Sequence, residues 1–135
     1  MKTLAIFVLL SISSSIFANT DAQLLIRELE RELDTCIEQD STSIGMRICL
    51  ANQYGQLDDL LNKTYRELRA SLEEGPKSKL IQSQRDWIKY RTSNCEFEGS
   101  SVMGGTMETI IMMDCDNQMT IEKIKQLDAR LNGPQ

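Results

Sequence analysis

The sequence predicts an all-α fold: a small disulfide-stabilised helical domain built on a long antiparallel helical hairpin with shorter flanking helices. Two observations support this prediction. Apolar residues recur in steps of three and four along most of the chain, which is the periodicity of amphipathic helices. Four cysteines occur in 135 residues behind an apolar N-terminal stretch, and an even count in a short exported chain indicates disulfide bonds.

The N-terminus has the pattern of a secretory signal peptide. Lys2 gives a positive start, residues 4–10 are an unbroken apolar run, and small residues follow up to Ala18. We predict a signal peptide over residues 1–18, with Ala22 as the alternative cleavage position. The apolar run is too short to span about 30 Å of hydrocarbon, so no membrane anchor is expected after signal removal. The mature chain is expected to be secreted, or periplasmic in a Gram-negative bacterium, with one domain over residues 23–131.

The first helix is predicted from Asp21 to about Ile37. A polar break follows over residues 38–43, where Thr42 or Ser43 can accept a hydrogen bond from a free backbone amide and so cap the next helix. The inner face of the first helix is expected to carry Leu24, Leu25, Leu29, Leu33 and Cys36.

The hairpin consists of a long helix over residues 44–73 and a return helix over residues 76–98. Gly75 is expected in the left-handed conformation after the first of these helices, and Pro76 in the first turn of the second. The apolar face of the long helix comprises Leu50, Tyr54, Leu57, Leu61, Tyr65, Leu68 and Leu72. The return helix has a heptad seam, flanked by Leu80 and Trp87, that consists of Ile81, Gln84, Ile88, Arg91 and Cys95.

Arg91 is a charged residue at a seam position. A buried guanidinium needs a carboxylate and hydrogen bonds, because its desolvation is otherwise costly. Antiparallel pairing about Gly75 places Arg91 near Asp58, so we predict an ion pair between them with Asn62 nearby. Trp87 and Tyr90 lie toward the same seam, and core packing is favoured over an exposed aromatic binding pair.

The C-terminal third is predicted as a loop followed by two short helices. Residues 99–106 are a flexible Gly-Ser loop by composition. Residues 107–116 are expected to be helical, with a strand over 109–113 as the alternative. Thr120 is expected to cap the last helix, and residues 132–134 to end it. The inner face of this last helix is expected to carry Ile121, Ile124, Leu127 and Leu131.

Four cysteines allow three disulfide connectivities. We predict nearest-neighbour pairing, Cys36 with Cys49 and Cys95 with Cys115, because each pair brackets a helix break. A zinc site is the alternative, but the spacings do not fit one and the chain has no histidine. No metal or other cofactor is predicted.

The residue types argue against an enzyme. Histidine is absent, which excludes imidazole-dependent catalysis, and oxidised cysteines supply no thiolate nucleophile. Carboxylate pairs such as Asp58 and Asp59 are typical of solvated helix faces. The net charge of −5 argues against nucleic acid and anionic membranes as partners and permits a basic partner.

Several motifs resemble the LprI-like family of small secreted bacterial proteins named for a lysozyme inhibitor. The resemblance covers most of the chain from Cys36 to Leu131. Lys123 stands where the family often has arginine, and the lipid-anchor cysteine of its lipoprotein members is absent. The resemblance implies a helical, exported, disulfide-bonded domain and supports the Cys95–Cys115 bond. The motifs are Asp58-x-x-Leu61-Asn62-x-x-Tyr65-x-x-Leu68, Gln84-Arg85-x-Trp87-x-x-Tyr90-Arg91-x-x-x-Cys95, Gly104-Gly105-Thr106, Cys115 and Thr120.

The sequence therefore predicts a non-enzymatic binding protein, and the resemblance implies a basic lysozyme-like enzyme as its leading partner. An envelope structural or stress-related protein is one alternative, and a glycan hydrolase that uses surface carboxylates is another. The loop held between Cys95 and Cys115 is the expected binding segment, because a constrained loop loses less entropy on binding. Its candidate contact residues are Glu98, Ser100, Ser101, Met103 and Glu108.

Overall fold

The computed structural model describes residues 20–133, and the predicted signal peptide lies outside the described residues. These residues form helices α1 (Asp21–Gln39), α2 (Ser43–Ser71), α3 (Glu74–Gly99) and α4 (Thr106–Asn132), with a short 3-10 turn, η1 (Ser100–Val102), before α4. No strand occurs in this range. The predicted all-α class is confirmed, and residues 109–113 are helical.

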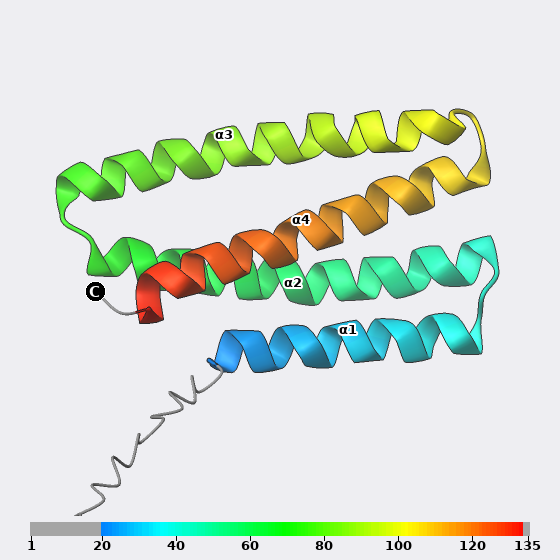
Figure 1. Cartoon of the computed structure of the whole chain (residues 1–135), viewed down its shortest axis with the longest axis horizontal. Helices are drawn as coiled ribbons and strands as arrows, with labels where there is room; N and C mark the ends of the chain where they lie inside the picture. Colours follow the sequence, from blue (N-terminus) through cyan, green and yellow to red (C-terminus); the bar gives the residue numbers. More distant parts are fainter. Residues whose placement is uncertain (1–19, 134–135) are drawn as a thin grey trace, which may run out of the picture.

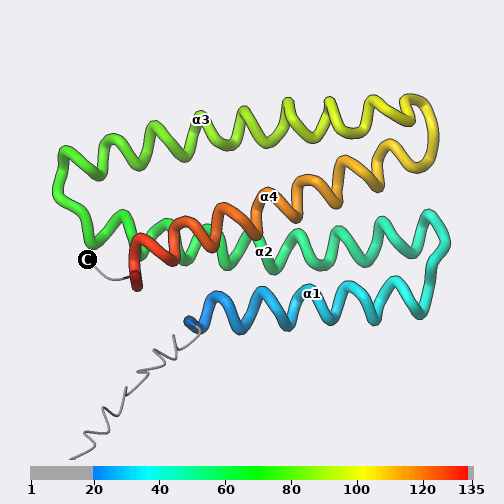
Figure 2. Tube along the Cα trace, viewed as in Figure 1, coloured from blue at the N-terminus to red at the C-terminus, as the bar shows by residue number. Residues whose placement is uncertain are grey.

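The helices run back and forth along one long axis (Figure 1). The central pair is α2 and α4, and α1 packs mainly against α2. The main partner of α3 is α4 rather than α2, although α2 and α3 are consecutive in the chain. The Cα trace shows α4 diverging from α3 as it runs toward its C-terminal end and crosses α2 (Figure 2). This arrangement determines which side chains meet Arg91.

The core lies between α1, α2 and α4. Leu24 and Leu25, which the periodicity placed on the inner face of α1, are 51% and 43% exposed. Ile26 takes the inner position instead, because the series 26, 29, 33 is also spaced by three and four and points at α2. Leu57 and Ile124 are fully buried at the centre. The buried core comprises Ile26, Leu29, Leu57, Leu60, Leu61, Leu68, Ile121, Ile124 and Leu127.

Threonine caps begin the first two helices. The Gly45 amide donates to Thr42 Oγ1 at 3.1 Å, which confirms the predicted cap of α2. Gly75 does not follow a helix in the left-handed conformation as predicted. It lies within the first turn of α3, because extended backbone at Leu72 and Glu73 makes the turn between α2 and α3. Among the described residues, positive φ occurs at Gly104 alone, at 78°.

The predicted break before Thr120 is wrong, because α4 is one continuous helix. Nothing between Asp116 and Thr120 interrupts helical hydrogen bonding. The Thr120 hydroxyl donates to the backbone carbonyl of Asp116, one turn earlier, at 2.7 Å. Thr120 is therefore a buried interior residue and not a cap.

Both predicted disulfides are confirmed, Cys36–Cys49 and Cys95–Cys115. They join α1 to α2 and α3 to α4 close to the two turns that lie at the same end of the long axis (Figure 1). We call this end, comprising residues 36–49 and 95–115, the disulfide-linked end. Over residues 20–133, none of the helices combines the length and apolar character needed to cross a membrane.

Candidate functional site

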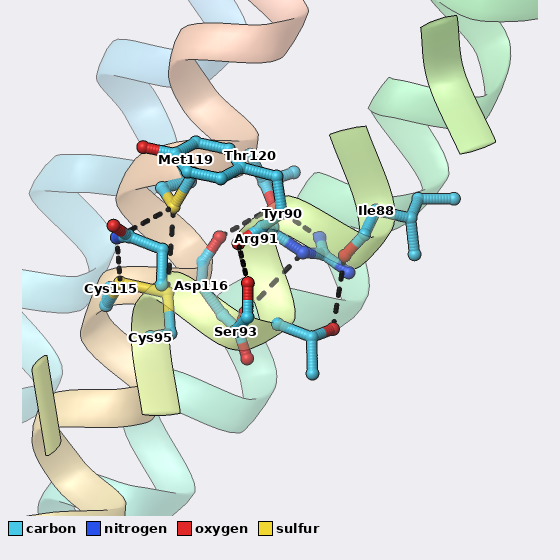
Figure 3. Close-up of a disulfide and its surroundings, with 11 residues drawn as sticks. Ile88, Tyr90, Arg91, Ser93, Cys95, Cys115, Asp116, Met119 and Thr120 are labelled. Carbon is cyan, nitrogen blue, oxygen red and sulfur yellow. Dashed lines mark hydrogen bonds and ion pairs between the residues drawn. A yellow bond between two sulfur atoms is a disulfide. The ribbon is translucent and has the colours of Figure 1, made fainter. Parts of the chain in front are cut away.

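Arg91 is the centre of a polar cluster between α3 and α4 (Figure 3). Its Nη1 donates to Thr120 Oγ1 at 2.7 Å, and its Nε lies 3.5 Å from Asp116 Oδ1. The guanidinium carbon lies 4.9 Å from the centre of the Trp87 ring and 5.9 Å from that of Tyr54. Both aromatic distances are in the range of cation–π contacts. Arg91 therefore joins α3 to α2 and α4 at once.

The predicted Arg91–Asp58 pair is wrong. Asp58 accepts a hydrogen bond from Asn62 Nδ2 at 3.0 Å on the exposed side of α2. Arg91 pairs with Asp116 because α3 packs against α4, which brings the α4 carboxylate closer to the guanidinium. The predicted core position of Trp87 is partly fulfilled, since its ring packs against the core. Tyr90 and Ile88, in contrast, are 59% and 45% exposed.

Burial determines the electrostatics of this cluster. It raises the pKa of the Asp116 carboxyl above its ordinary value, and the nearby Arg91 guanidinium opposes that rise. Burial also lowers the pKa of the Lys123 ammonium, which lies 5.6 Å from the Trp87 ring centre. Desolvation thus outweighs attraction at Asp116. The Arg91–Asp116 pair links α3 to α4, and it is a weak source of net stability because desolvation offsets the attraction between the two charges.

A groove of about 360 Å³ lies between α2 and α3. It is lined on one side by the Asp58, Asn62 and Tyr65 stripe of α2, and on the other by Gln84 and Arg91 of α3. The first motif and the first half of the second therefore meet at this groove, whereas Tyr90, Cys95 and the C-terminal motif residues lie outside it. Gln84 is 9% exposed, and its Oε1 has no hydrogen-bond partner among the described residues.

The predicted binding loop is compact rather than extended. The helix α3 continues to Gly99, and η1 follows directly. Glu108 Oε2 accepts a hydrogen bond from the Gly104 amide at 2.7 Å, which closes the turn. Of the five candidate contact residues, Glu108 is half-buried and the other four are exposed. Among the large apolar side chains of residues 20–133, Met103 is the most exposed at 76%.

Sequence reasoning missed other exposed apolar side chains at the disulfide-linked end. Phe97 is 72% exposed, Met107 42% and Val102 37%. Ile44 and Ile48, near the start of α2, are 64% and 55% exposed at the same end. Apart from Ile48, each lies within or close to a predicted break or loop, and an apolar residue at such a position is the available signal.

Comparison with known proteins identifies the family. The family model described as "Lysozyme inhibitor LprI" matches residues 36–127, about two thirds of the chain. The chain belongs to the LprI family. It is also similar to an uncharacterised protein, R02472, of Rhizobium meliloti strain 1021, with 29% identity over 99 residues that cover 64% of this chain and 71% of the relative. No solved structure matches.

Family membership gives the two disulfides a context. The match begins at Cys36 and includes all four bonded cysteines. Disulfides persist in oxidising compartments. Together, the bonds and the family point to a location outside the cytoplasm.

The Arg91 cluster yields a prediction about Thr120. Replacing Thr120 by valine keeps the shape of the side chain and removes the oxygen that accepts from Arg91. Because a hydrogen bond to a charged group contributes about 1.5–3 kcal/mol, we expect the free energy of unfolding to fall by about 2 kcal/mol in urea denaturation. The control is Thr92→Val, since exposed Thr92 bonds only the carbonyl of Ile88. Equal losses for both variants would show that the Arg91 contact contributes nothing.

Proposed function

We propose that this protein is a non-enzymatic, exported binding protein that inhibits a basic lysozyme, and that it contacts the enzyme through the disulfide-linked end. The observation that carries the proposal is the exposed apolar surface at Phe97 and Met103 in a member of the LprI family. The location we propose is the periplasm if the source is Gram-negative.

The exposure of these side chains supports a binding role. Large apolar side chains that remain in solvent at one end of a small domain are typical of interaction sites. Phe97 and Met103 are each more than 70% exposed, on either side of η1. The Cys95–Cys115 bond spans 20 residues and constrains this segment. A constrained segment loses less conformational entropy when it binds.

The charge of the chain suits a basic enzyme. The net charge is −5, and Glu96 and Glu98 are exposed beside Phe97. Carboxylates around an apolar contact steer a basic partner during encounter and contribute more to the association rate than to the affinity. We therefore expect inhibition to weaken as the salt concentration rises.

The test is a turbidity assay in which a basic lysozyme clears bacterial cell walls. We expect the purified mature protein to slow clearing at micromolar concentration. The double variant Phe97→Ala/Met103→Ala is expected to need at least tenfold more protein for the same effect. Leu24→Ala is the matched control, because Leu24 is 51% exposed but lies at the start of α1, away from the disulfide-linked end (Figure 1).

Two results would contradict the proposal. The first is no slowing of the lysozyme by the unaltered protein at micromolar excess. The second is inhibition by the double variant at the concentration that suffices for the unaltered protein, which would place the contact elsewhere. Circular dichroism of each variant establishes that the helices are intact before its inhibition is compared.

A further inference from the structure

Lys123 is a buried lysine on α4 without a carboxylate partner among the described residues. It is 7% exposed, and none of the ion pairs within residues 20–133 involves it. Its Nζ donates to Gln126 Oε1 at 3.1 Å, although an ammonium has three hydrogens to donate. A charge that is removed from water ordinarily has an opposite charge and hydrogen bonds beside it. The presence of Lys123 at this position therefore requires an explanation.

The Lys123 ammonium lies at the wall of a hollow where α3 and α4 meet. It lies between two other lining groups, 3.1 Å from Gln126 Oε1 and 5.6 Å from the centre of the Trp87 ring. The Gln126 side is exposed, so a small molecule in the hollow can approach the ammonium from solvent. The volume, about 480 Å³, is in the range of small-molecule sites. The lining residues are Trp87, Gln118, Met119, Glu122, Lys123 and Gln126.

The electrostatics of Lys123 differ from those of the neighbouring Arg91. Both cations lie over the Trp87 ring, but Arg91 is paired with Asp116. Burial lowers the pKa of the Lys123 ammonium, and no attraction to a carboxylate opposes this shift. Lys123 is therefore the cation of this contact that lacks a counter-charge. An anion in the hollow would supply it.

The lining residues favour a small carboxylate that has an apolar body. One unpaired ammonium matches one negative charge, and the exposed amides of Gln118 and Gln126 can donate to carboxylate oxygens. The Glu122 carboxylate also lines the hollow, and it disfavours the second negative charge of a phosphate because like charges repel. Trp87 and Met119 supply apolar surface for the rest of the ligand.

We propose that this hollow is a second binding site, which takes a small monocarboxylate with its carboxylate at Lys123 and its apolar body against Trp87 and Met119. The site is separate from the disulfide-linked end, and it does not depend on lysozyme inhibition. A charge-assisted hydrogen bond from an ammonium to a carboxylate is about twice as strong as a neutral one. The ligand would therefore bind chiefly through Lys123.

The experiment uses the fluorescence of Trp87 in the folded mature protein. Trp87 is the single tryptophan of the chain, so its emission reports on this hollow. The probe is phenylacetate, and phenylacetamide is the uncharged comparison. We expect a saturable change with phenylacetate, and binding at least tenfold weaker for phenylacetamide and in Lys123→Met. Lys89→Met is the matched control, because Lys89 is exposed on α3 outside the hollow, and it should bind within twofold of the unaltered protein.

Three binding results would overturn the proposal. One is no saturable change with phenylacetate at millimolar concentration. Another is equal binding of phenylacetate and phenylacetamide, which would show that the hollow does not recognise charge. The third is tighter binding of inorganic phosphate than of phenylacetate. The comparison of these probes uses the unaltered protein, so it does not depend on whether Lys123→Met folds.

Urea denaturation of Lys123→Met separates a binding role from a structural one. Replacing an unpaired buried charge by an apolar side chain of similar length is expected to leave the urea midpoint unchanged or to raise it. A lower midpoint, with phenylacetate binding retained, would show that Lys123 serves the packing of α3 on α4 through Trp87 and Gln126, and would overturn the proposal.

Discussion

Leu57→Ala is expected to lower the free energy of unfolding by about 3 kcal/mol, within the range of roughly 2–5 kcal/mol for buried leucines. Leu57 is fully buried in the cluster formed by α1, α2 and α4. Truncation removes favourable burial and leaves a cavity, because three helices that hold each other in place collapse only partly around it. Urea denaturation followed by circular dichroism measures the change.

The matched control is Leu24→Ala in α1. Its side chain is 51% exposed, so the change is expected to stay within about 0.5 kcal/mol, as is usual for surface substitutions. The comparison uses the same chemistry at a buried and an exposed position. Similar losses for both variants would place the α1 helix in the rotation that its leucine pattern predicted, and would contradict the observed packing.

In α1, the apolar periodicity predicts that a helix forms but does not determine which of its faces is buried. Leu24, Leu25 and Ile26 are consecutive, and both Leu25 and Ile26 begin a series that reaches Leu29 and Leu33 in steps of three or four. The sequence predicts a helix here, with residues 21–37 close to the observed 21–39. Its rotation depends on contact with α2 and α4, which no pattern within α1 records. The leucine count favoured the wrong face.

The partner of Arg91 could have been found from the sequence. Pairing Cys95 with Cys115 fixes the register of two antiparallel helices. Arg91, one turn before Cys95, must then lie opposite a residue about one turn after Cys115, and this is where Thr120 lies. The prediction of Asp58 instead assumed that α2 and α3 pack together because one turn joins them. Chain neighbours need not be the closest packing partners.

Of the two candidate surfaces, the sequence predicts the loop between Cys95 and Cys115 but not the groove between α2 and α3. The glycines and serines between Cys95 and Cys115 predict a flexible loop, and Met103 is the one exposed apolar residue among its predicted contacts. The groove was not predicted, since Gln84 and Arg91 were interpreted as seam residues. A seam pattern shows that residues share one helix face. It does not show whether the facing helix lies close enough to cover them.

Of the four helices over residues 20–133, α3 is expected to depend most on a single covalent bond, the Cys95–Cys115 disulfide, for its attachment to the rest of the domain. The buried residues of α3 are Gln84, Cys95 and Gly99. Little apolar surface is therefore buried between α3 and α4. Replacing Cys95 and Cys115 together by alanine is expected to lower the free energy of unfolding by about 3 kcal/mol, from the chain-entropy effect of a loop of this length. Urea denaturation of the double variant measures the loss.

Hydrogen exchange distinguishes this bond from the other one. Without Cys95–Cys115, the backbone amides of α3 should lose protection before those of α2 and α4, because local opening follows weak packing. The comparison is the Cys36→Ala/Cys49→Ala variant, which lacks the other disulfide. That bond spans 13 residues, and its removal should lower the free energy of unfolding by a similar amount. In that variant the amides of α1 should exchange early while those of α3 stay protected. Retention of full α3 protection without its own disulfide would show that contacts with α4 alone, including Arg91 with Thr120, suffice to hold the helix.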